Sequence, residues 1–203
     1  MQTLTHVFFD VGGVLGSNGW DREQRARAIA RFGLDSEFEH RHHEVVGSLE
    51  TGAMSLDEYL EITIFSKRRD ISRAEFTEFM RAQSEPDEAV IAIARRVATT
   101  GRVRLMTLNN ESAELNRHRI ERFGLREIFS AFLSSCWLGC AKPSHTFFDR
   151  ALGIAQAVPE RCLLIDDREQ NVVPARALGM RAILFTGADA LERELASAGL
   201  LGP

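Results

Sequence analysis

Residues 6–15 read HVFFDVGGVL, an apolar run that ends in Asp10 and is followed almost at once by Gly12 and Gly13. The run includes β-branched Val7 and predicts a buried strand. Open α/β sheets keep their active sites at the carboxyl ends of the strands, which is where Asp10 would lie. An ionised carboxylate is costly to bury alone, so Asp10 needs a compensating partner from elsewhere in the chain.

The length and composition are those of one α/β domain, or of a core domain with a modest insertion. The chain has 203 residues, and its net charge of -4 argues against general nucleic-acid binding, which requires clustered basic residues. No apolar run approaches the roughly 18 residues of a membrane span, and the N-terminus lacks the apolar core of a signal peptide. The three cysteines cannot all pair, which favours a reduced protein. We therefore expect a cytoplasmic protein with neither a nucleic-acid nor a membrane partner.

Helical patterns with their own start and stop signals fill residues 17–84. The first two helices are expected over residues 22–32, where Gly33 ends the helix, and over 36–49. Two more are expected to begin at the capping boxes Ser55–Glu58 and Ser72–Glu75. No strand is expected in this stretch. We interpret residues 17–84 as an inserted α-helical cap domain.

From Pro86 onward, apolar strand patterns alternate with helical ones. Strands are expected over 103–108, 131–134, 162–165 and 182–185. Helices are expected over about 90–97, 112–124, 144–153 and 172–178, with a last helix from about 189. Residues 136–143 are expected to form a loop. Such alternation predicts a parallel sheet with helices on both faces. The predicted fold is a doubly wound, Rossmann-like α/β core formed by residues 1–16 and 85–203.

Three of the expected strands end in polar side chains, which would meet at one edge of a parallel sheet. These side chains belong to Asp10, Asn109, Asn110, Asp166 and Asp167. Three carboxylates at one place repel one another unless a cation lies between them, and ligands that offer only oxygen favour Mg²⁺. Lys142, placed by Pro143 just before a helix, can neutralise both the carboxylates and an anionic substrate.

These segments, in this order, resemble the motifs of the haloacid dehalogenase superfamily, most of whose members are Mg²⁺-dependent phosphatases. Asp10 is similar to the nucleophile of the first motif. Asn109 is similar to the polar residue of the second motif that binds the transferring phosphate, and Asn110 to an Asn often found beside it. Lys142-Pro143 resembles the third motif, and Asp166-Asp167 with Asn171 resembles the fourth. The resemblance runs from residue 6 to about 186, and residues 17–84 look like the family's α-helical cap.

The resemblance implies a reaction on a small phosphorylated metabolite. Asp10 would attack phosphorus, and water would hydrolyse the resulting aspartyl-phosphate. Mg²⁺ would be bound by Asp10, the backbone carbonyl of Gly12 and Asp167, with Asp166 either a ligand or a neighbour. The phosphate would be held by residues of the glycine turn and of the second and third motifs, namely Gly12, Gly13, Asn109, Asn110 and Lys142.

One position departs from the family pattern. Gly12 stands where the family has a second Asp, which protonates the leaving group and later activates water. Loss of a general acid–base group typically costs about 10²–10⁴ in rate. Three interpretations are open: a good leaving group, as in acyl or sugar 1-phosphates; a substitute from the cap such as Asp21, His42 or His43; or a reaction other than phosphate release.

Two other functions fit Gly12. A metal-free 2-haloacid dehalogenase would use Asp10 to attack carbon, and the departing halide needs no proton, although paired Asp166 and Asp167 are then unexplained. A catalytically weakened member could bind a phosphate ligand as a sensor.

Other motifs are less informative. Cys136 and Cys140 are too few for a zinc site, and the glycine turn does not match a dinucleotide motif. Residues 40–43 (HRHH) are expected to form a solvated helix face. The identity of the substrate and the oligomeric state remain open at this stage.

Overall fold

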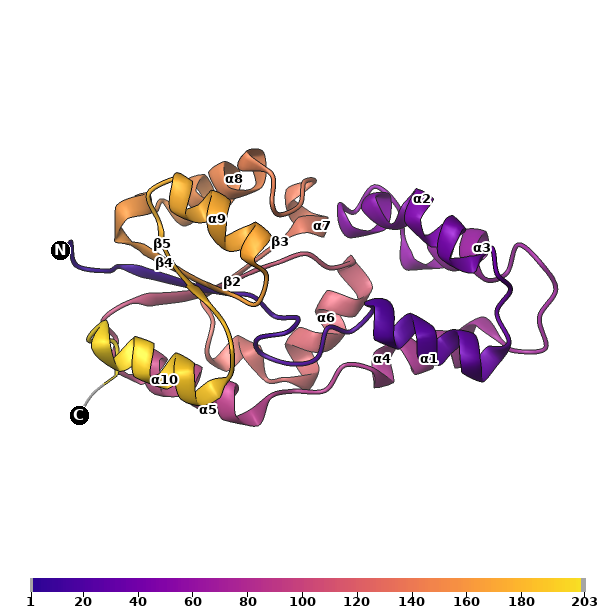
Figure 1. Cartoon of the computed structure of the whole chain (residues 1–203), viewed down its shortest axis with the longest axis horizontal. Coiled ribbons are helices and arrows are strands. Elements are labelled where there is room, and N and C mark those ends of the chain that lie inside the picture. The colour runs from indigo at the N-terminus through magenta and orange to yellow at the C-terminus, as the bar shows by residue number, and fades with distance from the viewer. Residues whose placement is uncertain (1, 202–203) are drawn as a thin grey trace.

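The computed structural model describes residues 2–201 and has a five-stranded, fully parallel sheet at its centre (Figure 1). The strand order is β3-β2-β1-β4-β5, so the strand before Asp10 is the middle one. The strands are β1 (His6–Phe9), β2 (Arg104–Asn109), β3 (Ala131–Ser134), β4 (Cys162–Asp166) and β5 (Arg181–Leu184). The predicted fold class is confirmed.

Ten α-helices and two short 3₁₀ turns accompany the sheet within residues 2–201. The helices are α1 (Arg22–Phe32), α2 (Phe38–Glu50), α3 (Leu56–Thr63), α4 (Arg73–Ala82), α5 (Glu88–Thr99), α6 (Ala113–Arg122), α7 (Ser135–Leu138), α8 (His145–Ala155), α9 (Glu169–Ala177) and α10 (Ala188–Ser197), and the turns are η1 (Leu125–Glu127) and η2 (Pro159–Arg161).

Local signals place most helix ends where the sequence predicts them. Gly33 ends α1 in the left-handed region at φ 58°, and Ser55 and Glu58 form the expected capping box of α3. Ser72 accepts the backbone N–H of Glu75, but within the described residues the reciprocal bond from Glu75 is not formed. Only one of the two hydrogen bonds of a capping box is therefore present at the start of α4.

Several boundaries differ from the prediction, among them those of α2, α7 and α9. The expected loop over 136–143 begins instead with the single-turn helix α7, which Gly139 ends in the left-handed conformation. Helix α2 begins at Phe38 rather than at residue 36, and α9 begins at Glu169 rather than at residue 172. One turn of helix has no apolar period of its own, so the sequence carries no sign of α7.

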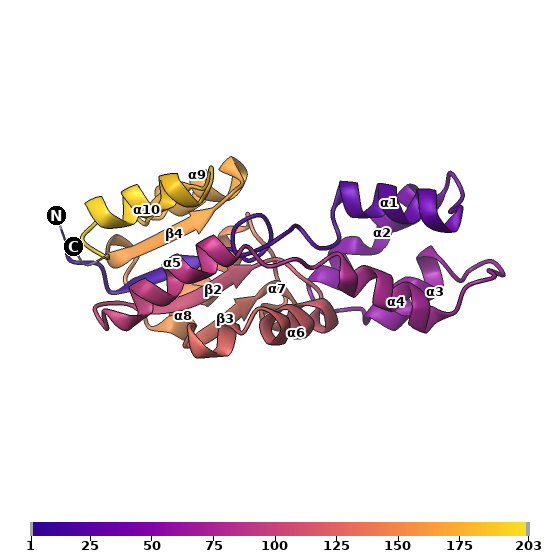
Figure 2. The ribbon, with the colours of Figure 1, turned by 90° about the horizontal axis from the view of Figure 1, so that it is seen from below.

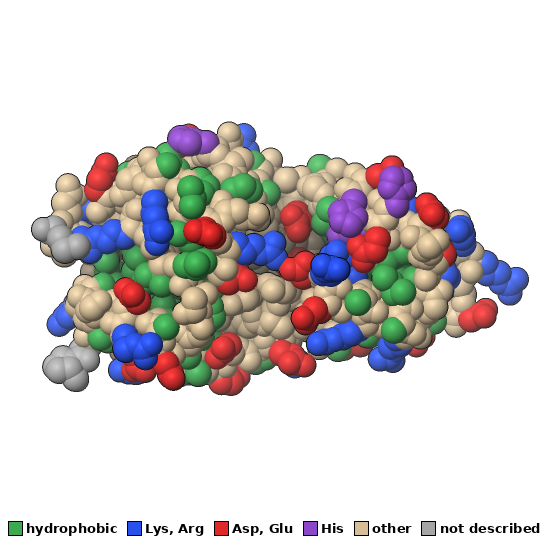
Figure 3. All heavy atoms as spheres, in the orientation of Figure 1, with side chains coloured by type: hydrophobic (Ala, Val, Ile, Leu, Met, Phe, Trp, Pro, Cys, Tyr) green, Lys and Arg blue, Asp and Glu red, His purple; other side chains and the backbone are tan. Residues whose placement is uncertain are grey.

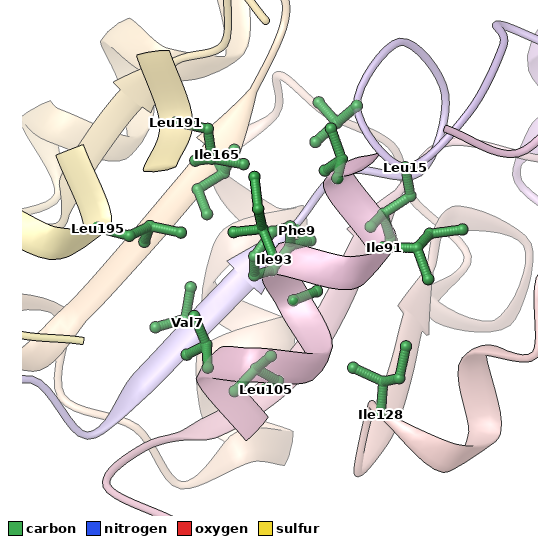
Figure 4. Packing of buried hydrophobic residues seen from close by; sticks show 14 of the residues in the cluster. Val7, Phe9, Leu15, Ile91, Ile93, Leu105, Ile128, Ile165, Leu191 and Leu195 are labelled. Atoms are coloured by element: carbon green, nitrogen blue, oxygen red, sulfur yellow. The ribbon is translucent and has the colours of Figure 1, made fainter. Parts of the chain in front are cut away.

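Apolar residues bury the two faces of the sheet separately. One face, with Val7 and Phe9 from β1, packs against α5, α10 and the segment around η1 (Figure 4). The opposite face, with Phe8, packs against α8 and α9. Because successive side chains of a strand point to opposite faces, burying both sides leaves only the strand ends for polar groups.

Helices α1 to α4 form a separate layer beyond the carboxyl ends of the strands, at the end of the molecule away from both termini (Figure 2). Residues 17–84, hereafter the helical segment, contain these four helices and no strand, and they have an apolar core of their own. The two connections to the sheet run side by side, because Ser17 N–H donates to the carbonyl of Glu85 (2.8 Å) and Asp87 N–H donates to that of Leu15 (2.9 Å).

A buried polar relay crosses the core of the helical segment. The indole N–H of Trp20 donates to the hydroxyl of Tyr59 (2.9 Å), and that hydroxyl lies 2.8 Å from Nδ1 of His42. Because an indole can only donate, the hydroxyl hydrogen of Tyr59 is free to be donated to His42 Nδ1. The hydroxyl of Tyr59 thus gives a hydrogen-bond partner to both the indole of Trp20 and the ring of His42.

None of the helices within residues 2–201 is both long enough and apolar enough to cross a membrane.

We expect Tyr59→Phe to lower the free energy of unfolding by about 1–3 kcal/mol, because it leaves two buried polar groups without their partner. Urea unfolding followed by circular dichroism measures the change. The exposed hydroxyl of Ser197 provides the control, and Ser197→Ala should stay within about 0.5 kcal/mol of the parent protein. Equal stability of Tyr59→Phe and the parent would contradict the structural role given to the relay.

Candidate active site

Three acidic side chains meet at the carboxyl edge of the sheet. One oxygen from each of Asp10, Asp166 and Asp167 lies within 4.8 Å of the other two. Strands β1 and β4 are parallel neighbours with Phe9 opposite Ile165, so the next residues, Asp10 and Asp166, emerge side by side. The convergence of acids expected from the strand ends is therefore present in the structure.

Lys142 supplies the positive charge inside this cluster. Its Nζ lies 2.6 Å from Asp166 Oδ2 and 3.1 Å from Asp10 Oδ2, and its side chain is 1% exposed. The side chain of Asn110 fixes the loop that carries Lys142, because its amide accepts the N–H of Lys142 and donates to the carbonyl of Lys142, both at 2.9 Å. Asn110 thus positions the lysine.

Burial and like charge govern the protonation of the acids. Burial raises the pKa of Asp10 to about 7, and Asp166 and Asp167 add to this effect while Lys142 opposes it. Burial also raises the pKa of Asp167, as does the neighbouring charge of Asp166. For Lys142, burial alone would lower the pKa, but the charges of Asp10 and Asp166 outweigh it and raise the pKa. One ammonium therefore faces three acids, an excess of negative charge that favours a further cation.

The donor set fits a divalent metal ion. All three acids offer carboxylate oxygens, the ligands that Mg²⁺ prefers. Oδ1 of Asp167 is buried and has no hydrogen-bond partner among the described residues, a costly arrangement that a bound cation would relieve. Gly13, at φ +76°, packs so closely on Oδ2 of Asp167 that a Cβ atom would clash with it. The glycine turn therefore allows Asp167 to reach the cluster.

Asn171 and the backbone of Arg168 complete the surroundings of Asp166. Asn171 Nδ2 lies 2.9 and 3.1 Å from the two oxygens of Asp166, and Arg168 N–H donates to Oδ1 at 2.9 Å. With Lys142 on Oδ2, each oxygen of Asp166 already accepts at least two hydrogen bonds. Asp167, with its unpartnered oxygen, is the better direct metal ligand of the two.

Asn109 lies in a different setting from its neighbour. It is 1% exposed, its amide donates to Oδ1 of Asn116 (3.1 Å), and its Oδ1 accepts from Oγ of Ser134 (2.7 Å). Both polar ends of the Asn109 side chain are thus used within the fold. The phosphate-binding role expected of Asn109 stays a prediction, which this arrangement does not favour.

A cavity of about 290 Å³ opens above the acidic cluster. Figure 3 shows acidic and basic side chains gathered around the hollow between the sheet domain and the helical segment. The sheet domain contributes Asp10, Gly12, Asn110, Glu111, Arg119, Lys142 and Arg168, and the helical segment contributes Trp20, Asp21, Arg25, His42, His43 and Glu50, among others. The cavity is therefore polar and charged on both sides.

Arg119, which carries no functional signal in the sequence, lies beside Gly12. A Cβ atom on Gly12 would lie 3.4 Å from Arg119 Nη1 and 3.3 Å from Asn18 Oδ1. Arg119 is 2% exposed; it pairs with Glu111 (3.8 Å) and donates to the carbonyl of Ser17. A guanidinium keeps its proton at all working pH values, so it can stabilise negative charge here but cannot act as an acid. Nothing in the local pattern of α6 distinguishes Arg119 from a surface arginine.

The three substitutes considered for the missing acid are otherwise engaged. Asp21 pairs with Arg168 (2.6 Å) and caps α1. His43 is exposed and its Nδ1 lies against the carbonyl of Glu39. His42 is 4% exposed, and burial, with the charge of Arg25, lowers its pKa to about 4, so it is neutral near pH 7.

The expectation of a solvated face over residues 40–43 is wrong for His42. The side chain of His42 turns inward to the hydroxyl of Tyr59.

Comparisons with known proteins agree with this geometry. A family model described as HAD-hydrolase-like matches residues 139–199. The phosphoserine phosphatase of Thermus thermophilus is 33% identical over 119 residues, which are 58% of this chain and 46% of that protein. The chain spans less than half the length of these curated relatives; for a flavin mononucleotide hydrolase of Arabidopsis thaliana the share is 31%.

Solved structures share the fold at low sequence identity. A HAD family enzyme of Bacteroides thetaiotaomicron, in complex with magnesium and inorganic phosphate, matches with a TM-score of 0.78 and 17% identity over 90% of this chain and 94% of that one. An L-2-haloacid dehalogenase of Xanthobacter autotrophicus, with chloropropionic acid covalently bound, matches with a TM-score of 0.62 and 16% identity over 99% and 85%. The fold alone does not separate these two chemistries. The family match over residues 139–199 and the shared fold make this chain similar to the HAD-like hydrolases.

Proposed function

We propose that this chain is a Mg²⁺-dependent phosphatase that acts on a small phosphorylated metabolite, with Asp10 as the nucleophile. The observation that carries the proposal is the gathering of Asp10, Asp166 and Asp167 within 4.8 Å around the single charge of Lys142. Further support comes from the similarity to a phosphoserine phosphatase and to an enzyme crystallised with magnesium and phosphate.

The residues can be given roles in this reaction. Asp10 is held by its Oδ1, which accepts the N–H of Val11 at 2.7 Å, and its carboxylate would attack phosphorus to form an aspartyl-phosphate. Lys142 would hold a phosphoryl oxygen and keep Asp10 ionised. Backbone N–H groups of Gly12 and Gly13 would complete the phosphate site, and Asn110, whose amide holds the loop of Lys142, would line it.

Mg²⁺ would be bound by Asp10, Asp167 and the backbone carbonyl of Gly12, with Asp166 beside them. When bound, it neutralises negative charge on the phosphoryl oxygens and lowers the pKa of Asp10.

Halide displacement by Asp10 is the alternative reaction. Oδ1 of Asp167, which is buried and has no partner among the described residues, favours the phosphatase, because displacement of a halide gives no role to a third carboxylate. A phosphate-binding sensor without turnover is the other alternative, and the buried, correctly paired Asp10 and Lys142 favour catalysis over it.

We expect Asp10→Asn to abolish turnover, with a loss of about 10³-fold or more, because the amide cannot form the phospho-enzyme. Phosphate release from p-nitrophenyl phosphate with Mg²⁺ measures the loss. Asp70→Asn is the control, since Asp70 is exposed and distant in sequence from every motif. Chloride release from 2-chloropropionate by the parent protein in the presence of chelator, without phosphate release, would replace the proposal by the dehalogenase reaction.

We expect Mg²⁺ to raise the melting temperature of the parent protein, because a ligand that binds only the folded state adds about 2.7 kcal/mol at a hundred times its Kd. Thermal unfolding with Mg²⁺ and with chelator measures the shift. In Asp167→Asn the shift should be lost, and in Asp70→Asn it should be retained. A shift of the same size in Asp167→Asn and the parent would rule out a cation at Asp167.

A further inference from the structure

One carboxyl group in the cavity has no partner. Glu50, the last residue of α2, lines the same cavity as Asp10. Within residues 2–201, no hydrogen bond or ion pair engages the carboxyl group of Glu50, whereas Asp21 pairs with Arg168 and Glu111 pairs with Arg119 and accepts the N–H of Ser112. Among the cavity acids outside the metal cluster, Glu50 alone is free to exchange a proton with a bound substrate.

The backbone around Glu50 is fixed to the sheet domain. The carbonyl of Glu50 accepts the hydroxyl of Ser135 (2.5 Å), and the same hydroxyl accepts the N–H of Glu111 (3.0 Å), the residue after Asn110. Gly52, at φ +74°, packs on the carbonyl of Cys136, where a Cβ atom would clash. Figure 1 shows the end of α2 beside α7. Glu50 is therefore anchored at the junction of the helical segment and the site.

The charges around Glu50 balance one another. Glu111 and Asp21 act on Glu50 as nearby negative charges. Arg168 and Arg25 act on it as nearby positive charges. Burial raises the pKa of Glu50 to about 7, with Glu111 adding to the rise and Arg168 opposing it. Both protonation states are then populated near neutral pH, as general acid–base catalysis requires.

We infer that Glu50 is the general acid and base of the reaction, in place of the carboxylate that Gly12 lacks. The inference rests on the proposed phosphatase activity. The geometry of in-line transfer supports it, because attack by Asp10 from the sheet edge directs the leaving oxygen toward the helical segment, the side that carries Glu50. Gly12 itself has no side chain that could supply this proton.

As Asp10 forms its bond to phosphorus, the bond to the leaving oxygen breaks and the Glu50 carboxyl proton moves to that oxygen, giving the free alcohol. Water then attacks phosphorus and gives a proton to the Glu50 carboxylate, while the bond from Asp10 to phosphorus breaks. The products are the alcohol and inorganic phosphate, and both carboxyl groups return to their starting states.

The test compares two leaving groups at saturating Mg²⁺. With phenyl phosphate, whose phenolate is a poor leaving group, we expect Glu50→Gln to lower kcat/KM by about 10²–10⁴-fold. With p-nitrophenyl phosphate, whose leaving group needs little protonation, the loss should be less than about tenfold. Retained activity on p-nitrophenyl phosphate also shows that the variant folds. Glu44→Gln, an exposed residue on the same helix, is the matched control and should act as the parent does on both substrates.

The pH profile gives a second readout. A general acid works only when protonated, so kcat/KM of the parent for phenyl phosphate should fall as pH rises through about 7, and Glu50→Gln should lose this limb. Equal losses on the two substrates, no loss on either, or an unchanged pH limb in Glu50→Gln would each overturn the assignment. If the parent releases phosphate from neither substrate, the proposed function fails instead, which is a distinguishable result.

Discussion

Repulsion among three carboxylates at the carboxyl ends of β1 and β4 is the constraint around which this protein is built. Asp10, Asp166 and Asp167 each place a carboxylate oxygen within 4.8 Å of the other two. Without a compensating positive charge, these carboxylates would repel one another strongly. Lys142 offsets one charge, and the remaining excess favours a divalent cation. In the proposed reaction, Asp10 would attack only once positive charge surrounds it, so metal binding and catalysis would depend on one electrostatic balance.

The helical segment closes this charged edge and changes its chemistry. It brings Trp20, Arg25, His42 and Glu50 to a cavity whose floor the sheet supplies. In the proposed reaction, charge stabilisation would come from the strand ends and proton transfer from Glu50 at the end of α2. Arg119 adds a buried positive charge beside Gly12, 3.4 Å from where a Cβ atom of residue 12 would lie.

Much of the fold and the metal cluster was predictable from the sequence, for a physical reason. Strand ends, capping boxes such as Ser55–Glu58 and glycine stops are local signals, and parallel strands bring their carboxyl ends to one edge whatever the details of packing. Other features had no local signal. The single turn of α7, the inward turn of His42 and the buried pair of Arg119 with Glu111 depend on contacts between segments distant in the chain.

The order of apolar runs and acidic strand ends by itself determined the parallel sheet, the helical insertion and the meeting of Asp10 with Asp166 and Asp167. Only the tertiary structure decided which cavity groups are free and which are engaged. Asn109, Asp21 and His42 are equally polar in the sequence, yet hydrogen bonds and ion pairs commit each of them, while the carboxyl group of Glu50 has no partner within residues 2–201. A side chain's protonation and availability depend on its burial and neighbours, and those are properties of the packed molecule rather than of the residue type.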